Sequence, residues 1–414
     1  MALRQVPIAQ LQLGMYVAKL DLPWFRSPFL RHSFLVETQS QITRLIKAGV
    51  RTVMIDPDQG LAVPGTFDTH NSRFTDSEDK RLDKESVHSQ PPVKSLAQLH
   101  EEYTQAKLVQ HKLDQAVQAV FSAITKTGTI RPEQAAEAVQ EITIAAKTLP
   151  RSALFMALTQ SRAGDAVLGR HALSTCTLAL LLGQSFQFNP LELQQLATAA
   201  LLHDIGLMQI PTELLRRIRV TSTPLSQEEQ LKFHAHPRLS VQTLEQQGAF
   251  EPAVLQLIVH HHPSLPHYGL SAPAAPSSLS HATGILMTVD YFDELITGFG
   301  GASPLTTQQA LQRIYMERQQ NGIDSQILTR FISIIGIYPV HSYVKLNSKE
   351  LGIVTALNAE KLHQPVVTIT HNPDGAEYPS PLVVDLAHQE ERTTPRAIES
   401  VLDGQPTAST PRAA

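Results

Sequence analysis

The stretch from Leu196 to Pro211, LATAALLHDIGLMQIP, most strongly limits what this chain can fold into. Apolar residues with helical spacing lead up to His203 and Asp204, after which Gly206 and Pro211 break the pattern. These two polar side chains are therefore predicted at the end of a buried helix. A buried carboxylate needs a partner, which a divalent metal shared with histidines supplies. A core histidine bonded to the neighbouring aspartate would also supply one, so the dipeptide alone leaves both interpretations open.

Further side chains of the same chemistry follow the same helical region. Five separate segments each supply an imidazole or a carboxylate: His171, His203 with Asp204, His236, His261 with His262, and Asp290. Imidazole and carboxylate without thiolate suit iron, manganese, zinc or nickel. Because this many ligands exceeds the need of one ion, we predict two divalent ions bridged by Asp204.

Composition narrows the class of protein. A length of 414 residues predicts two or three domains, and a net charge of -4 provides no basic surface for DNA. The lone Cys176 excludes a disulfide within the chain, which suits a reducing cytosol. Apolar runs such as Phe331 to Val340 are about half the ~20 residues that a membrane span requires. The N-terminus lacks the apolar core of a signal peptide. We therefore expect a cytoplasmic protein without a membrane span.

The first part of the chain divides at a change of composition. Residues 1–60 are predicted to form a small α/β module, with strands over 15–20 and 51–55 and a helix that begins at the capping box Thr38-x-x-Gln41. Residues 61–94 are poor in apolar side chains and are predicted to be a flexible linker. An apolar stripe from Leu99 to Ile124, with Gln110 as its one polar member, predicts an amphipathic helix. That stripe could pack within the chain or on a second copy.

The remainder is predicted to be mainly helical and then β. Apolar residues keep helical spacing over residues 95–336, and over 337–390 they change to short alternating runs separated by turn residues. Residues 391–414 are predicted to be a disordered tail. The predicted fold class is therefore mainly α: a helical bundle, preceded by a small α/β module and followed by a small β unit.

Several stretches carry a family resemblance. The segment VPIAQLQLGMYVAKLDLPWFRSPFL and the later AGVRTVMID resemble a DUF3391-type module, which implies a regulatory or assembly role. The segments ALLHDIG, PLSQEEQLKFHAHPRLS, VLQLIVHHHP and VDYFDEL resemble the HD-GYP subfamily of HD-domain metal-dependent phosphohydrolases, over roughly residues 165–335. The segment YPVHSYVKLNSKELGIVTALN resembles the C-terminal extension of the same proteins.

The resemblance implies a helical bundle whose binuclear or trinuclear centre hydrolyses cyclic di-GMP. Carried over position by position, the implied metal ligands are His171, His203, Asp204, His236, His261, His262 and Asp290. Trinuclear members carry a glutamate four residues before the first of these histidines, where this chain has Val167. We therefore expect two ions, iron or manganese, with Asp204 as the bridge and a metal-bound hydroxide as the nucleophile.

The chain departs from the family around the substrate. Leu207 stands where the family has a lysine that contacts phosphate, and Pro263 stands where it has a glutamate. The Gly-Tyr-Pro order is lost in HHPSLPHYGLS, and the Arg-Pro-Tyr that follows the DALT-like segment is absent. Tyr268 and Arg238 are the remaining candidates for substrate contacts, although an arginine on a helix is more often solvated.

Three functions follow from these features. The first is a phosphodiesterase that opens cyclic di-GMP to pGpG or GMP in bacterial second-messenger signalling. The second is a catalytically weak or inactive homologue that keeps its metal and acts as a cyclic di-GMP sensor or protein-interaction module, with a second copy or a signalling protein as partner. The third is a phosphohydrolase with another nucleotide as substrate. A gain of activity in a Leu207→Lys variant would show that substrate contacts, and not metals, were lost.

Overall fold

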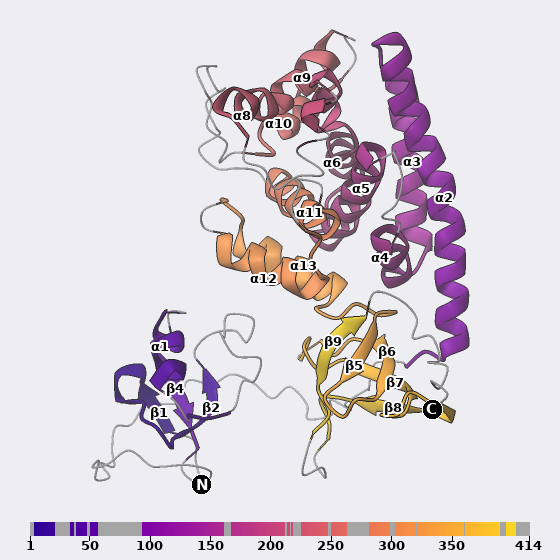
Figure 1. The fold of residues 1–414 in the computed structure, drawn as a ribbon. Coiled ribbons are helices and arrows are strands. Elements are labelled where there is room, and N and C mark those ends of the chain that lie inside the picture. The colour runs from indigo at the N-terminus through magenta and orange to yellow at the C-terminus, as the bar shows by residue number, and fades with distance from the viewer. Residues whose placement is uncertain are drawn as a thin grey trace, which may run out of the picture. The chain divides into compact units, whose positions relative to one another are not determined.

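The chain falls into two compact units in its computed structural model (Figure 1). The units are residues 1–88 and 89–414, and each is described by itself. The structure describes residues 4–20, 34–36, 39–47, 50–56, 93–160, 167–211, 213–215, 217, 225–246, 250–262, 281–298, 303–318, 321–359, 361–389 and 395–402.

The first unit is a small sheet with one α-helix. Its antiparallel strands have the order β1-β4-β2-β3 and are β1 (Arg4–Pro7), β2 (Tyr16–Leu20), β3 (Phe34–Leu35) and β4 (Thr52–Ile55). The short η1 (Ile8–Gln10) and the helix α1 (Gln39–Lys47) complete the described elements. Alternate residues Val53 and Ile55 of β4 point into the core. The predicted strands over 15–20 and 51–55 are confirmed as β2 and β4, whereas Thr38 lies outside the described residues.

The second unit contains the helices that carry the candidate site. Their bounds are α2 (Leu96–Thr127), α3 (Pro132–Thr148), α4 (Arg151–Gln160), α5 (Val167–Ser185), α6 (Pro190–Leu202), η3 (Ile205–Gln209), α8 (Gln227–His234), α9 (His236–Glu245), α10 (Pro252–Val259), α11 (His281–Thr297), α12 (Thr307–Glu317) and α13 (Ser325–Ile335). Of these, α5 is buried on nearly every face and packs against α2, α3, α6 and α11. The helical bundle predicted for this region is confirmed.

The long helix α2 lies along the bundle (Figure 1). It begins with a capping box, in which Ser95 Oγ accepts a hydrogen bond from the Gln98 backbone N–H and the Gln98 side chain accepts one from the Ser95 N–H. The predicted apolar stripe packs within the chain, against α3, α4 and α5. Gln110 is buried in this stripe and donates a hydrogen bond to Asp114, which satisfies its amide. Of the two alternatives, the structure therefore shows the apolar stripe of α2 packed within the chain.

The C-terminal part is a five-stranded antiparallel sheet with the order β8-β7-β6-β5-β9. Its strands are β5 (Tyr343–Leu346), β6 (Leu351–Ala356), β7 (Val366–His371), β8 (Glu377–Asp385) and β9 (Ile398–Leu402). A cavity of about 480 Å³ lies between this sheet and the first turns of α2, with Tyr103 and His341 among its lining residues. The small β unit predicted for this region is confirmed.

The expected disordered tail from residue 391 is wrong for the residues that form β9. This strand pairs with β5, with Tyr343 opposite Leu402. The segment before it is held by an ion pair, because Arg396 donates hydrogen bonds of 2.6 and 2.7 Å to both oxygens of Glu350. Backbone pairing to an existing sheet edge orders these residues, and their short sequence does not reveal that edge.

The other predicted boundaries are not decided by the described residues. Nearly all of the linker predicted over 61–94 and the last twelve residues lie outside them. The divisions at residues 60, 94, 336 and 390 stay predictions. Within the part of the chain that the structure describes, no helix combines the length and the apolar composition that a membrane span requires.

Candidate metal centre

The structure brings all seven predicted ligand residues together inside the bundle. His171 lies in the second turn of α5, His203 and Asp204 follow α6, and Asp290 lies in the middle of α11. His236 begins α9, and His261 and His262 follow α10. All are buried except His262, whose side chain is 23% exposed. Ligand atoms lie within 4.8 Å of one another in overlapping groups: His171, His203 and Asp204; His236, His261 and His262; and His203, His261 and Asp290.

Three of the histidines are oriented by helix ends. His203, His236 and His261 each follow a helix, where the last carbonyl groups have no partner within that helix. Each ring donates its Nδ1–H to the carbonyl three residues earlier, over 2.9 Å to Ala200, 2.7 Å to Phe233 and 2.5 Å to Ile258. These acceptors assign the hydrogen of the neutral ring to Nδ1 and leave Nε2 as a bare acceptor.

The fourth histidine is oriented by a carboxylate that the sequence analysis missed. The His171 Nδ1–H donates to Asp293 Oδ2 over 2.7 Å, and Ser174 donates its hydroxyl to Asp293 Oδ1 over 2.5 Å. Burial alone would lower the pKa of His171, but hydrogen bonds with Asp290 and Asp293 raise it well above its usual 6.5. The spacing of Asp293, three residues after Asp290 on the same helix, was the available signal.

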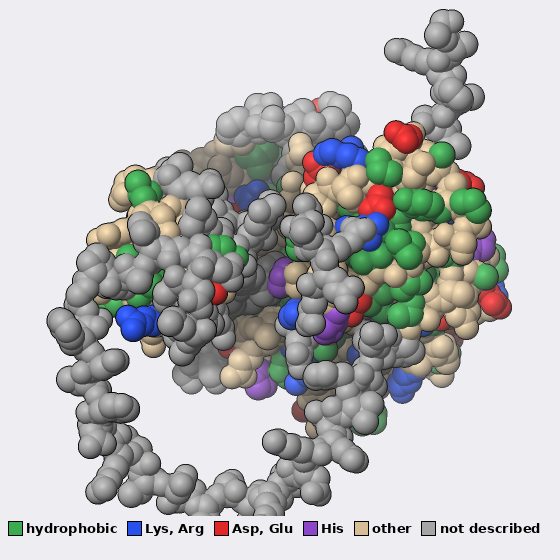
Figure 2. Space-filling view, turned by 90° about the horizontal axis from the view of Figure 1, so that it is seen from below, with side chains coloured by type: hydrophobic (Ala, Val, Ile, Leu, Met, Phe, Trp, Pro, Cys, Tyr) green, Lys and Arg blue, Asp and Glu red, His purple; other side chains and the backbone are tan. Residues whose placement is uncertain are grey.

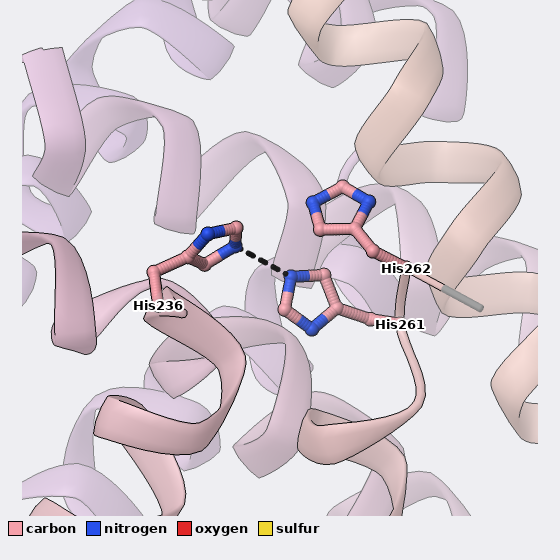
Figure 3. Close-up of side chains that lie close together, drawn as sticks. All are labelled: His236, His261 and His262. Carbon is pink, nitrogen blue, oxygen red and sulfur yellow. Dashed lines mark hydrogen bonds between the residues drawn. The ribbon is translucent and has the colours of Figure 1, made fainter. Parts of the chain in front are cut away.

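The Nε2 atoms meet in two close pairs. Those of His171 and His203 are 3.2 Å apart, and those of His236 and His261 are also 3.2 Å apart (Figure 3). Neutral rings whose hydrogens are on Nδ1 cannot hydrogen-bond through two bare Nε2 atoms, so each pair requires a proton or a metal ion between its nitrogens. Metal–nitrogen bonds of about 2.0–2.1 Å place neighbouring ligand atoms about 3.0–3.4 Å apart, which the two pairs match.

Two carboxylates complete the arrangement. Asp204 Oδ1 lies 3.1 Å from the Nε2 atom of His236, and Oδ2 lies 3.7 Å from that of His171, so Asp204 faces both histidine pairs. Asp290 Oδ1 lies 3.0 Å from the Nε2 atom of His171 and 3.2 Å from that of His203. Asp204 Oδ1 is buried and accepts no well-aligned hydrogen bond.

The histidines keep the Asp204 carboxylate ionised. Burial alone would raise the pKa of Asp204, but the neighbouring His203 and His236 hold it well below its usual range. Imidazole nitrogens lie around ionised carboxylates, and one carboxylate oxygen, Asp204 Oδ1, is buried without a hydrogen-bond partner. This set of donor atoms fits divalent transition ions.

Replacement of Asp293 with asparagine should weaken metal binding about 10- to 100-fold, the range for a group that orients a histidine ligand. The amide keeps the size of the side chain but removes the charge that faces His171. Calorimetric titration of the metal-free protein with Mn²⁺ measures the change. Asp374→Asn, in an exposed turn, is the matched control. Equal affinities in Asp293→Asn and the wild type would contradict the assigned role.

Gly206 permits the close approach of η3 to α9. A Cβ atom there would overlap the backbone carbonyl of His236 and lie 2.6 Å from the Ser240 nitrogen. The Gly206 N–H donates to Ser240 Oγ over 2.8 Å, and that hydroxyl donates to the His203 carbonyl over 2.5 Å. The glycine therefore sets the spacing between the segments that carry His203 and His236.

Gly206→Ala should lower the free energy of unfolding by about 1–3 kcal/mol through overpacking, and should weaken metal binding as His236 moves away. Urea denaturation and metal titration measure the two effects. Gly284→Ala is the control, because a Cβ there meets only the tip of the Ile327 side chain. A Gly206→Ala variant with the same free energy of unfolding as the control would show that η3 and α9 can move apart without loss of stability.

Leu207 and Val167, two positions at which the sequence departs from the family that it resembles, belong to one apolar region. Leu207 is fully buried in a cluster with Ile210 and Leu214, and Val167 and Phe233 pack against that cluster. The two departures noted in the sequence therefore lie in one apolar cluster of the structure.

Of the two substrate-contact residues predicted from the sequence, the structure describes only Arg238. Tyr268 and Pro263 lie outside the described residues. Arg238 is half-buried on α9, and its contact with substrate stays a prediction. On the face drawn in Figure 2, the described Lys and Arg side chains lie scattered among acidic and apolar ones. This face does not gather positive charge.

One further acidic residue joins the cluster. Glu294 lies one helical turn after Asp290, and its carboxylate is within 4.8 Å of ligand atoms of Asp290 and His262. Burial and the charge of Asp290 raise the pKa of Glu294 well above its usual range. The sequence analysis missed this residue, although the four-residue spacing in VDYFDEL was a signal for it.

Comparisons with known proteins agree with this architecture. Two family models match: "Domain of unknown function (DUF3391)" over residues 3–135 and "HD domain" over residues 164–327. The DUF3391 match extends through α2, beyond the predicted module boundary at residue 60. The chain is 25% identical over 372 residues to the cyclic di-GMP phosphodiesterase PA4108 of Pseudomonas aeruginosa, covering 89% of this chain and 85% of that protein.

Solved structures of HD proteins are also similar. One is Bd1817, an HDG"Y"P protein from Bdellovibrio bacteriovorus, with a TM-score of 0.45 and 15% identity over 80% of this chain and 99% of that one. Another is the HD domain of the L. monocytogenes phosphodiesterase PgpH in complex with cyclic-di-AMP, with a TM-score of 0.30 and 13% identity over 40% of this chain and 85% of that one. The two family-model matches and the curated relative confirm the resemblance noted in the sequence: residues 164–327 are similar to an HD domain, and residues 3–135 are similar to a DUF3391 domain.

Proposed function

We propose that this protein is a metal-dependent phosphodiesterase that hydrolyses cyclic di-GMP to pGpG or GMP in the cytoplasm. The observation that carries the proposal is the pair of close Nε2 contacts among histidines whose Nδ1 hydrogens are committed elsewhere, with Asp204 facing both pairs. The curated relative named a cyclic di-GMP phosphodiesterase supports this substrate.

The proposed centre divides its ligands between two positions. His171, His203 and Asp290 hold one, His236, His261 and His262 hold the other, and Asp204 is shared. When bound, the ions supply Lewis acidity, which lowers the pKa of water towards neutrality and offsets the charge of the phosphodiester. Asp293 fixes the His171 ring, and the helix-end carbonyls fix the other rings, so the chain holds its donor atoms in place before substrate arrives.

A second candidate is a metal-binding sensor with little or no turnover. One structural observation favours it: Leu207 is buried in an apolar cluster, so the side chain at the family's phosphate-contacting position cannot reach a phosphate as a charge. Loss of one charge-assisted contact costs about 1.5–3 kcal/mol, which lowers a rate or an affinity about ten- to a hundredfold.

The deciding experiment is turnover by the metal-loaded protein. Full-length protein loaded with Mn²⁺ or Fe²⁺ is incubated with cyclic di-GMP, and the products are separated by chromatography, with Asp204→Ala as the control. Linear products that disappear in the control support the phosphodiesterase. Binding of cyclic di-GMP without turnover supports the sensor. Turnover of cyclic di-AMP alone would contradict the proposed substrate and favour a different nucleotide.

A further inference from the structure

A cavity that the proposed function does not use lies between α2 and the C-terminal sheet (Figure 1). Its volume of about 480 Å³ is typical of small-molecule sites. One wall is the first turns of α2, where Leu96, His100 and Tyr103 lie on one helical face. Strands β5 to β8 and His341, two residues before β5, form the other wall. Since protein interiors leave few voids of this size, the lining residues indicate what could fill it.

The lining is aromatic and carries little charge. Its tyrosines and histidines are Tyr103, Tyr343, Tyr378, His100, His341 and His371. The ring centroids of Tyr103 and His341, which come from opposite walls, are 6.0 Å apart. Among the described residues that line the cavity, Glu377 is the only acidic one and there is no lysine or arginine. Flat rings without a neighbouring cation favour an uncharged aromatic ligand over a phosphate.

The backbone fixes His341 at the cavity. Its φ of 77° lies in the left-handed region, which few residues other than glycine adopt, and its N–H donates to the Val354 carbonyl over 2.9 Å. His341 is only 5% exposed, and burial lowers its pKa to about 4, so the ring is uncharged at neutral pH. Its Nε2 atom is buried and has no hydrogen-bond partner among the described residues. An unpaired buried nitrogen costs stability unless another molecule supplies the hydrogen bond.

His371, on β7, also has a ring nitrogen without a partner. The Thr370 hydroxyl donates to the Leu351 carbonyl over 3.4 Å, so its oxygen accepts the Nδ1–H of His371 over 2.9 Å. The hydrogen of the neutral ring is therefore on Nδ1, which leaves Nε2 as a bare acceptor. This Nε2 atom is buried, and Glu377 Oε1, 3.8 Å away, is too far for a hydrogen bond. The lining thus contains two imidazoles that lack a partner.

A metal ion fits this cavity less well than it fits the bundle. Within the described residues, the sets of three histidine or carboxylate ligand atoms that lie within 4.8 Å of one another all belong to the metal centre. His341, His371 and Glu377 do not form such a set. A flat ring with an N–H donor can pair with an imidazole nitrogen and also stack on tyrosine. The cavity therefore suits an organic molecule better than an ion.

We propose that this cavity binds an uncharged heteroaromatic molecule whose N–H groups donate to the Nε2 atoms of His341 and His371. Because protein atoms cover both nitrogens, each ring turns about its Cβ–Cγ bond to meet the donor. The tyrosine rings of the walls pack on the ligand. The site goes beyond the proposed function and shares no residue with the metal centre. Water alone is the alternative occupant of the cavity.

Calorimetric titration of the full-length protein with indole tests the proposal. The matched probe is 1-methylindole, in which a methyl group replaces the N–H hydrogen. We expect indole to bind one-to-one and 1-methylindole to bind about tenfold more weakly, because it lacks the donor. Ala97→Phe places a ring in the cavity from the α2 wall and should abolish binding. Gln105→Phe, exposed on the same helix and outside the lining, should bind indole as the wild type does.

A double variant tests the two histidines. His341→Asn keeps a residue type that tolerates the positive φ but has a shorter side chain, and His371→Leu removes the other ring. The protein that carries both changes should bind indole and 1-methylindole with equal affinity. Thermal unfolding of every variant shows that the chain is folded.

Four results would overturn the proposal. The first is no saturable binding of indole, which leaves water as the occupant. The second is equal affinity of the wild type for the two probes, and the third is a preference for indole that persists in the folded double variant. The fourth is normal indole binding by folded Ala97→Phe, which places the site elsewhere. None of these results bears on hydrolysis of cyclic di-GMP, so this proposal can fail while the proposed function stands.

Discussion

Asp204→Ala should abolish both metal loading and hydrolysis of cyclic di-GMP. Asp204 faces both histidine pairs, with Oδ1 3.1 Å from the Nε2 atom of His236 and Oδ2 3.7 Å from that of His171. Its removal withdraws a negative charge from four imidazoles and leaves both pairs of bare nitrogens without a bridge. The loss of metal affinity should exceed the roughly hundredfold loss that follows removal of a residue that only hydrogen-bonds to a metal ligand.

Two measurements test this prediction: metal content by mass spectrometry and the rate of product formation. Asp204→Asn is the informative companion, because its amide keeps the shape and one oxygen but lacks the charge. We expect Asp204→Asn to retain some metal at high concentration and Asp204→Ala to retain none. An Asp204→Ala variant that binds its full complement of metal would contradict the bridging role, whatever its activity.

Leu207→Lys should lower the free energy of unfolding by about 3 kcal/mol or more and should not raise the activity. Leu207 is fully buried among Ile210, Leu214 and the side chains that pack on them. An ammonium group placed there loses its hydration and gains no carboxylate from this cluster, because the side chains that form it and pack on it, Val167 included, are apolar. We therefore do not expect the gain of activity that the sequence analysis named as the test for lost substrate contacts.

Urea denaturation of Leu207→Lys at several pH values measures this effect. Burial lowers the pKa of such a lysine in the folded protein. Between neutral pH and the higher pKa of the same lysine in the unfolded chain, the destabilisation should therefore be largest at neutral pH and should shrink as the pH rises. Leu207→Met is the control, and it should cost less than about 1.5 kcal/mol because its volume is similar. A stable Leu207→Lys protein with higher turnover would contradict this account.

The sequence revealed some of the candidate ligands because they stand as polar residues at the end of an apolar helix. His203 after α6 and His261 after α10 are visible in this way without any knowledge of packing. Asp293 and Glu294 were missed, because their spacing from Asp290 does not by itself say which face of α11 meets α5 and the segment after α10. The environment of Leu207 was hidden for the same reason, since Val167 joins its cluster from forty positions away.

The fold was predictable to a similar extent. Strands β5 to β8 alternate clearly in sequence and were expected, whereas β9 depends on the edge that β5 offers. The stripe of α2 predicted a helix, but its partner helices became known only from the structure.

The length of α2 gives the second unit a rigid connection to the helix that carries His171. Its 32 residues, Leu96–Thr127, span about 48 Å as one uninterrupted helix. In the C-terminal half of α2, the Gln118 side chain lies against Gly169, two residues before His171, with no space for a methyl group between them. A shift of α2 along its axis would therefore displace the helix that carries His171 and change the geometry of the candidate metal centre.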